Sequence, residues 1–335
     1  MILSRFTNGR YKGWVESSLQ LPPRLLEDPA TAAELQGAET LLDCRGRKIF
    51  RVTLELSDQS TPCFVYLFQN SSFSRCLRRS YAVHIFRMSE LLRESGFDTL
   101  EVLAAFRPKW QFLNWSSCLV ARELQSVQEL PSTGRHVYQL HTWADFTSDV
   151  ASAVAFNLAD LHNLRFVHGD LKTRHVLTRR NGPGRPPQVL FVDLEKTKRL
   201  PNALARLHDL FAARDLIQLL ASLPKELDGR TIQPNRDRFL AQYFRVRRLS
   251  PSRQRLISRL LGLYEPGGGL RQGETLFKSL IHGLAQRVSP RRKPSRRYEA
   301  PLPARSEPKR PRIWQVEPGV LSGKSDTKIK PGLEE

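Results

Sequence analysis

The sequence predicts an α+β fold of two lobes, a small antiparallel β lobe with one helix followed by a larger α-rich lobe. Between residues 41 and 69, apolar and polar residues alternate around turns at Gly46 and at 57–62, which is typical of antiparallel strands. From residue 149 onward, apolar residues recur at helical spacing. This second pattern is carried first by Val150, Val154, Leu158 and Leu161. The change of period separates the two lobes.

The small lobe is expected over residues 41–124, after an N-terminal extension at 1–40 without a clear period. Its helix covers 74–94 and should end at Gly96, because glycine readily adopts the left-handed conformation that closes many helices. Strands are predicted at 41–56, interrupted by the turn, and at 61–69, 102–106 and 117–121.

The large lobe is expected over residues 125–286. Helices are predicted at 149–162, 202–220, 235–245, 251–263 and 273–286. The remaining residues, 287–335, are rich in Pro, Lys and Arg and poor in apolar side chains, so this tail should be disordered.

The stretch 166–195 carries the chemistry of the chain. It alternates short apolar runs with loops, and Asp170 and Asp193 each follow one of these runs. Two carboxylates at the ends of neighbouring buried strands suit phosphoryl transfer from a nucleotide, which needs a base for the acceptor hydroxyl and a ligand for the metal. Asp170 is the candidate base, and Asp193 is the candidate metal ligand.

Two further side chains between these aspartates are candidates for the site. Lys172 lies two residues beyond Asp170, where its ammonium could stabilise the transferring phosphoryl group as a point charge. His175 lies five residues beyond Asp170, where protein kinases place an Asn that binds magnesium. Since magnesium prefers oxygen ligands, His175 is either an orienting hydrogen-bond partner for Asp170 or Asp193, or a weak metal ligand.

The motif HGDLKTRHVL followed by VLFVDLE resembles the lipopolysaccharide kinase (Kdo/WaaP) family, the bacterial Kdo/heptose kinases of the inner core. This family is distantly related to the protein kinases. The resemblance implies a protein-kinase-like two-lobed fold, ATP and Mg²⁺ as cofactors, and a sugar hydroxyl of lipopolysaccharide as acceptor. It also implies that the backbone of Glu123 and Leu124 contacts the adenine. The alternative is an unrelated α/β domain in which Asp170 caps a turn and Asp193 ends a strand.

The resemblance fails at one pair of positions. Kinases of this type carry a Lys on the third strand that contacts the phosphates and pairs with a Glu on the next helix. Here these positions fall on Phe68 and Ile85. Either Lys48 or Arg51 on the second strand replaces the lysine, or the alignment of the third strand is shifted.

The residues allow three functions. The first is an ATP-dependent phosphotransferase acting on an anionic sugar or glycolipid. The second is a pseudokinase scaffold for envelope assembly, and the third is a protein Ser/Thr kinase, since the fold does not choose between hydroxyls. Two more side chains have open roles: His162 is expected to be structural rather than catalytic, and Asp215 either steadies the catalytic loop or caps a helix or forms a surface pair.

Charge indicates an anionic partner. The formal net charge is +20, from 53 basic and 33 acidic residues. Part of this charge forms an expected rim around the acceptor entrance, although a solvated loop is the alternative. The rim residues are Arg174, Arg179, Arg180, Arg185, Lys196, Lys198 and Arg199.

The tail adds to the positive charge. Its basic runs are a candidate tether for an anionic membrane surface. With Trp314 alone for stacking on bases, nucleic acid is a less favoured partner. Four cysteines without paired spacing and the absence of a long apolar run predict a cytoplasmic protein. The basic tail extends this expectation to peripheral contact with the inner face of the cytoplasmic membrane.

Overall fold

A computed structural model of the chain places the described residues in one compact unit, Met1–Arg287. The structure describes residues 3–8, 10–44, 46–69, 80–109, 116–131, 142–143, 146–182, 185–202, 205–224, 226–227 and 230–262. The expected helix at 273–286 and the basic tail at 287–335 lie outside them, as do residues 74–79 of the expected small-lobe helix. None of the described helices is both long and apolar enough to cross a membrane.

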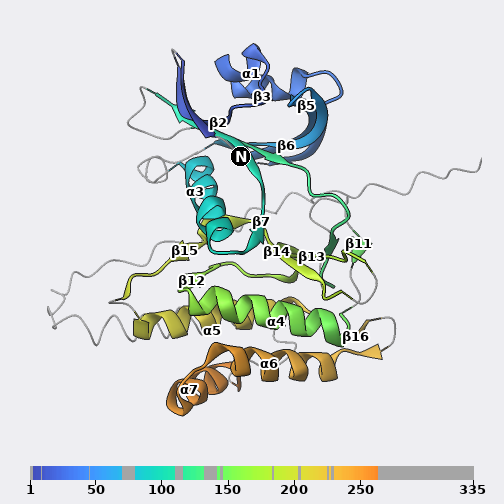
Figure 1. The fold of residues 1–335 in the computed structure, drawn as a ribbon, viewed down its shortest axis with the longest axis vertical. Helices are drawn as coiled ribbons and strands as arrows, with labels where there is room; N and C mark the ends of the chain where they lie inside the picture. Colours follow the sequence, from blue (N-terminus) through green and yellow to red (C-terminus); the bar gives the residue numbers. More distant parts are fainter. Residues whose placement is uncertain are drawn as a thin grey trace, which may run out of the picture. The chain divides into compact units, whose positions relative to one another are not determined.

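The small lobe is a curled antiparallel sheet (Figure 1). Seven strands lie in the order β1-β2-β8-β9-β6-β5-β3, and β4 pairs with β5 off this path. The strands are β1 Leu3–Thr7, β2 Tyr11–Glu16, β3 Leu19–Gln20, β4 Glu39–Cys44, β5 Arg47–Leu56, β6 Gln59–Gln69, β8 Val102–Pro108 and β9 Ser116–Arg122. The strands predicted from alternation correspond to β4, β5, β6, β8 and β9.

Residues 3–20, expected only as an extension, supply three strands to this sheet. Strand β2 pairs with β8, and β3 pairs with the end of β5. The sheet therefore begins at Leu3 rather than near residue 41. These strands escaped prediction because β1 and β2 are mostly half-exposed and lack a clear apolar alternation.

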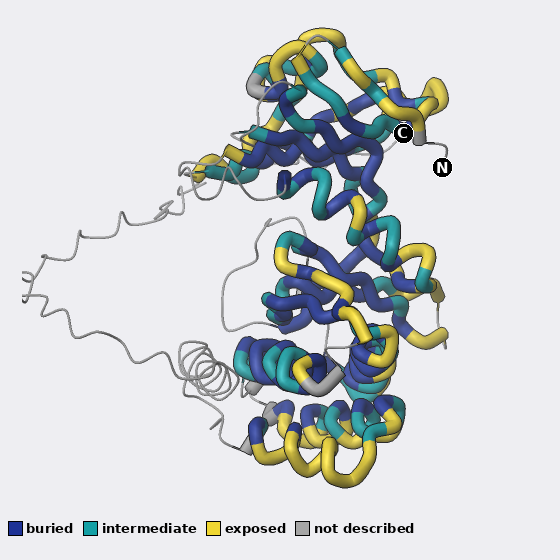
Figure 2. Tube along the Cα trace, turned by 90° about the vertical axis from the view of Figure 1, so that its left-hand side faces the viewer, coloured by how far each residue is buried: buried dark blue, intermediate teal, exposed yellow. Residues whose placement is uncertain are grey.

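Both faces of the β5–β6 hairpin are buried. Ile49, Tyr66 and Phe68 belong to the core that faces helix α3 (Tyr81–Glu94). Their neighbours in sequence, such as Phe50 and Leu67, belong to a second core with helix α1 (Pro23–Glu27) and the 3-10 helix η1 (Pro29–Glu34). Since side chains alternate across a strand, adjacent residues of β5 enter different cores. Figure 2 shows the strands of the small lobe as mostly buried residues.

Helix α3 starts and ends with ordinary helix signals. The Ser80 hydroxyl accepts a hydrogen bond from the Val83 backbone N–H at 3.5 Å, and Gly96 follows the helix with φ +86°. Its buried side chains, among them Ile85 and Leu92, face the sheet and the large lobe.

The large lobe combines helices with short strands (Figure 1). Helix α4 (Ser148–Asn163) packs against α6 (Gln233–Arg247), and α5 (Ala205–Ser222) packs against α7 (Pro251–Gly262). The side chains of α4 predicted at helical spacing are all buried. The short strands are β7 Asp98–Thr99, β10 Gln128–Glu129, β11 Thr142–Trp143, β12 Phe166–Val167, β13 Val176–Arg179, β14 Gln188–Phe191, β15 Lys198–Arg199, β16 Glu226–Leu227 and β17 Arg230–Thr231.

Strands β13 and β14 form the predicted hairpin, which sits in a five-stranded sheet of order β11-β10-β13-β14-β7. The outer strand β7 follows α3 and runs parallel to β14. The Thr99 hydroxyl donates to the Phe191 carbonyl at 2.5 Å, two residues before Asp193. This contact joins the segment after α3 to the strand that ends at the metal loop.

The contact of β2 with β8 depends on Gly13, which lies opposite Phe106. A Cβ at this position would lie 2.7 Å from the Phe106 Cα and would overlap the Ala105 carbonyl oxygen. We expect Gly13→Ala to lower the free energy of unfolding by about 1–3 kcal/mol, because the two strands must separate. Urea unfolding measures this change. The control Lys12→Ala on the same strand should change it by less than about 0.5 kcal/mol, and an equal effect of both would contradict the packing described.

Candidate active site

The catalytic loop between β12 and β13 is held from behind by a buried carboxylate. Asp215 on α5 accepts the backbone N–H of His168 at 2.7 Å and that of Gly169 at 2.9 Å. Gly169 has φ +79°, and a Cβ there would lie 2.7 Å from the Lys196 carbonyl oxygen, so the loop needs glycine. The loop-steadying role expected for Asp215 is confirmed, and the helix-cap and surface-pair alternatives are wrong.

His162 connects this carboxylate to the helices beneath it. Its Nε2 lies 3.3 Å from Asp215 Oδ2, and its Nδ1 lies 2.7 Å from the hydroxyl of Tyr243 on α6. Burial lowers the pKa of His162, although Asp215 acts in the opposite direction. The imidazole is fully buried and therefore structural, as expected from the sequence.

Asp170 is surrounded by positive charge. Lys196 Nζ donates to its Oδ2 at 2.9 Å, and Lys172 Nζ lies 3.0 Å from its Oδ1. Burial alone would raise the pKa of Asp170, but the two ammonium groups outweigh it and hold the pKa well below its ordinary value. The carboxylate is ionised at neutral pH and able to accept a proton or a hydrogen bond from a hydroxyl.

His175 lies between the two aspartates. Its Nδ1 is 2.7 Å from the Asp170 carbonyl oxygen, so this nitrogen carries the proton and donates it. Its Nε2 lies 3.3 Å from Asp193 Oδ2 and accepts from Arg174 Nε at 3.2 Å. Burial lowers the pKa of His175 to about 4, although Asp193 raises it, and the ring is therefore neutral at pH 7.

Asp193 follows β14 in a left-handed conformation with φ 59° and ψ 56°. Non-glycine residues adopt this conformation uncommonly, and Asp is among those that tolerate it best. The preceding residue, Val192, donates its N–H to the His175 carbonyl at 3.0 Å and accepts from His168 Nε2 at 2.8 Å. These bonds fix the metal loop to the catalytic loop on both sides of the hairpin.

The donor set fits a magnesium ion bound together with a nucleotide. Magnesium is commonly held by one or two carboxylates, waters and substrate phosphates rather than by a closed cage of side chains. Asp193 supplies a carboxylate, and the unprotonated Nε2 of His175 lies beside it. Within the described ranges, no cluster of three or more His, Cys, Asp or Glu side chains could hold a metal by itself.

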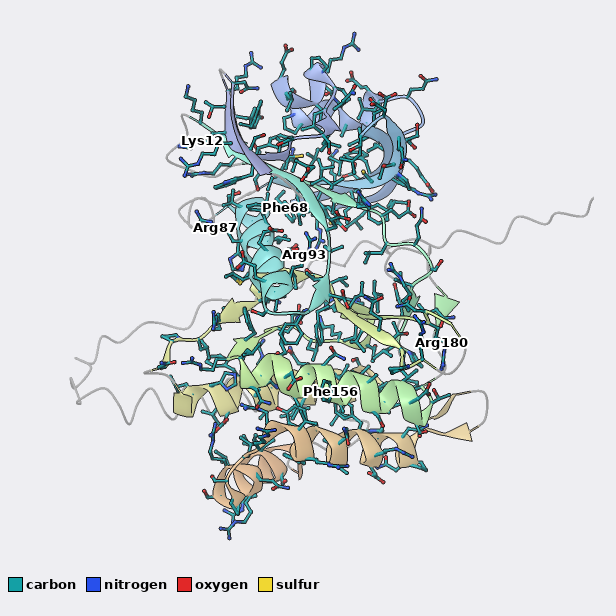
Figure 3. The ribbon with its side chains drawn as sticks, viewed as in Figure 1. Lys12, Phe68, Arg87, Arg93, Phe156 and Arg180 are labelled. Carbon is teal, nitrogen blue, oxygen red and sulfur yellow. The ribbon has the colours of Figure 1, made fainter. Side chains whose placement is uncertain are left out.

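The positions predicted for the usual lysine and glutamate are apolar. Phe68 lies where β6 meets the first turn of α3, with its ring centroid 5.8 Å from that of Tyr81 (Figure 3). Ile85 on α3 is also buried. The carboxylates of α3 are those of Glu90 and Glu94, and Glu90 pairs with Arg93 at 3.4 Å.

Neither Lys48 nor Arg51, the expected substitutes for this lysine, is well placed to contact the phosphates. Lys48 lies on the face of β5 that belongs to the second core and pairs with Asp43 at 3.0 Å. Arg51 lies on the face toward α3, but its Nε donates to Glu123 Oε2 at 2.9 Å.

Arg47 was not predicted as a site residue from the sequence. It shares its face of β5 with Ile49 and Arg51, and its Nη1 lies 2.8 Å from Glu195 Oε1, just beyond Asp193. Burial raises the pKa of Glu195, and Arg47 acts against that rise. Strand alternation places Arg47 on the same face of β5 as Ile49, but it does not show which face turns toward the metal loop. No local pattern pointed to Glu195.

The segment after β9 is placed as a hinge between the lobes. The Glu123 N–H donates to the Pro62 carbonyl at 2.9 Å, while Leu124 makes no backbone hydrogen bond within the described part of the chain. A cavity of about 800 Å³ borders both residues but contains neither Asp170 nor Asp193. It lies beside the hinge and is separate from the two aspartates.

The basic rim is only partly available to an acceptor. Arg180 pairs with Asp149 at 3.0 Å, and Lys196 is bound to Asp170. Lys198 and Arg199 lie over the rings of Phe211 and Phe166. The described rim therefore supplies positive charge, but several of its members have other partners.

Residues 66–243, more than half of the chain, match the lipopolysaccharide kinase (Kdo/WaaP) family. The chain belongs to this family. It thus has a protein-kinase-like α+β fold, as expected, and membership of a kinase family supports a kinase of the lipopolysaccharide type. A solved structure described as "WaaP in complex with acyl carrier protein" is similar, with 20% identity and a TM-score of 0.49 over 79% of this chain and 98% of that one. Among curated proteins, none matches the chain.

The first test of this site concerns Asp215. We expect Asp215→Asn to lower the free energy of unfolding by about 1–3 kcal/mol, because an amide leaves one of the two loop N–H groups without an acceptor. Urea unfolding followed by circular dichroism measures this change. Asp237→Asn, an exposed position on α6, is the matched control and should stay within about 0.5 kcal/mol. Equal stability of both variants would contradict the role of Asp215.

The buried histidines predict a pH dependence of stability. Burial lowers the pKa of His175 and of His208 from 6.5 to about 4. The unfolded chain therefore binds more protons than the folded one between about pH 4 and 6.5. The stabilising contribution of these neutral histidines should be complete above pH 6.5. The free energy of unfolding should therefore fall progressively as the pH drops below 6.5. Guanidinium unfolding at pH 7.5, 6.5, 5.5 and 4.5 tests this, and a flat profile down to pH 5 would contradict it.

Proposed function

We propose that this kinase transfers the γ-phosphoryl group of Mg-ATP to a hydroxyl of an anionic sugar or glycolipid, such as the inner core of lipopolysaccharide. The observation that carries the proposal is the placement of His175, which bonds to the backbone of Asp170 through Nδ1 and places its unprotonated Nε2 3.3 Å from the carboxylate of Asp193. A base and a metal ligand are thereby held a single imidazole apart, as an in-line phosphoryl transfer requires.

Asp170 receives the acceptor hydroxyl in this proposal. Its low pKa suits orientation of the nucleophile, with the proton taken late in a loose transition state. Lys172 lies 3.0 Å from Asp170 and is only partly exposed, so its ammonium stays within reach of the transferring group. Lys196 holds the other oxygen of Asp170 and fixes the rotation of the carboxylate.

Asp193, with His175 beside it, would hold the magnesium ion. Bound magnesium neutralises charge on the β- and γ-phosphates. The neutral imidazole leaves the Asp193 carboxylate its full negative charge toward a cation, and Arg174 helps to orient the ring. The backbone of Leu124 is the proposed contact for the adenine base, with Glu123 preceding it.

An anionic acceptor is supported by family membership and by charge. The family acts on the lipopolysaccharide inner core, and the chain has a net charge of +20. Peripheral contact of the basic tail with an anionic membrane surface at the cytoplasmic face is part of the same proposal.

A pseudokinase is the second candidate, and it is favoured by Phe68 and Ile85 at the positions of the usual ion pair. A protein Ser/Thr kinase is the third. These alternatives differ from the first in whether phosphate is transferred and in which product carries it.

Transfer of radiolabelled phosphate from ATP separates the three candidates. With lipopolysaccharide as acceptor, label should enter the lipid fraction, and Asp170→Ala and Asp193→Ala should each lower the rate by about 100- to 10,000-fold. Exposed Asp237→Ala on α6 is the control and should retain the wild-type rate. Label on protein instead of lipid would indicate a protein kinase. Nucleotide binding without transfer to any acceptor would indicate a pseudokinase.

A further inference from the structure

We propose that Arg47 contacts the nucleotide phosphates in place of the missing strand lysine, with Glu195 of the metal loop as its carboxylate partner. This inference rests on the proposed function, because it assigns a residue to the nucleotide site of the kinase. The cation lies at the first residue of β5, the second strand in kinase order, instead of on β6, the third. The carboxylate lies on the metal loop instead of on helix α3.

The guanidinium of Arg47 lies over two aromatic rings of β6. Arg47 lies opposite Phe68 in the β5–β6 pairing. Its guanidinium carbon is 5.6 Å from the ring centroid of Phe68 and 5.6 Å from that of Tyr66. A cation over these two aromatic faces is stabilised by their quadrupoles. The positive charge therefore lies over Phe68, the residue at the expected lysine position, and over Tyr66 on the same face of β6.

Arg47 has a carboxylate partner on the metal loop. Its Nη1 lies 2.8 Å from Glu195 Oε1, and both side chains are about three-quarters buried, with 24% and 23% exposed. A carboxylate that is largely buried needs such a partner, because a charge without one is costly at this depth. Glu195 is the second residue after Asp193, so the pair ties the cation to the loop that would hold the metal.

The turn that precedes Arg47 is fixed against the end of β6. Gly46 has φ +93°, and a Cβ there would lie 2.9 Å from the Gln69 carbonyl oxygen. The Gln69 N–H in turn donates to the Gly46 carbonyl at 2.9 Å. This hydrogen bond fixes the turn against the end of β6, and the first side chain of β5 points toward the metal loop. In kinases, the turn between the first two strands covers the phosphates.

The guanidinium of Arg47 suits contact with two anions. A guanidinium has five N–H donors in one plane, so it can hold a carboxylate and a phosphate oxygen at the same time. An ammonium at the end of a strand would act as a point charge instead. Among the other described cations near the site, Lys172 and Lys196 are bound to Asp170 and Arg51 to Glu123.

Binding of two ligands tests the proposal. Mg-ATP is titrated by calorimetry and adenosine by ligand-observed NMR against wild type, Arg47→Ala, Arg47→Lys and the control Arg5→Ala on edge strand β1. Arg47→Ala should weaken ATP binding by about 10- to 100-fold, because charge-assisted hydrogen bonds are lost, and leave adenosine binding unchanged. Arg47→Lys should recover part of the loss, and Arg5→Ala should bind both ligands as wild type does.

Three results would overturn the assignment. ATP binding by Arg47→Ala at wild-type strength would remove Arg47 from the phosphate site. Equal weakening of ATP and adenosine would make Arg47 a structural residue of the turn. In both cases wild type still binds ATP, so the proposed function stands. If wild type itself binds no Mg-ATP at millimolar concentration, the proposed function fails together with the assignment.

Discussion

The structure of the site depends on one buried carboxylate, that of Asp215. It accepts two consecutive N–H groups of the catalytic loop and contacts His162, which in turn bonds to Tyr243. Helices α4, α5 and α6 are thereby connected to the loop that presents Asp170. A loop with a left-handed glycine has no regular secondary structure to satisfy these N–H groups, so a side chain from a neighbouring helix must do so.

A second constraint is charge balance around the catalytic and metal loops. Asp170, Asp193 and Glu195 bring three carboxylates into a partly buried region. Lys172 and Lys196 offset the first of them, a neutral imidazole and magnesium would serve the second, and Arg47 offsets the third. Asp170 and Glu195 therefore each have a cationic partner, and the Asp193 carboxylate is left to a bound cation. Loss of the usual lysine and glutamate together is consistent with this rearranged set of charges.

Much of the site was predictable from local pattern. Asp170, Lys172, His175 and Asp193 were found from their spacing and from the apolar runs that precede them, and the structure brings them together. Asp215 was found with its role open, because its two hydrogen bonds join parts of the chain far apart in sequence. The strands β1 and β2 were missed, since their exposed and half-exposed residues carry a weak apolar alternation.

The sequence by itself determined the main strands and helices from residue 41 onward, the order of the two lobes and the two aspartates of the motif, because periodicity and spacing are local properties. The tertiary structure alone decided which face of β5 turns toward the metal loop. Both faces of this strand are buried in apolar cores, so alternation could not distinguish Arg47 and Arg51 from Lys48. Nor could any local pattern bring Glu195 to Arg47, since their contact arises only when the two lobes pack together.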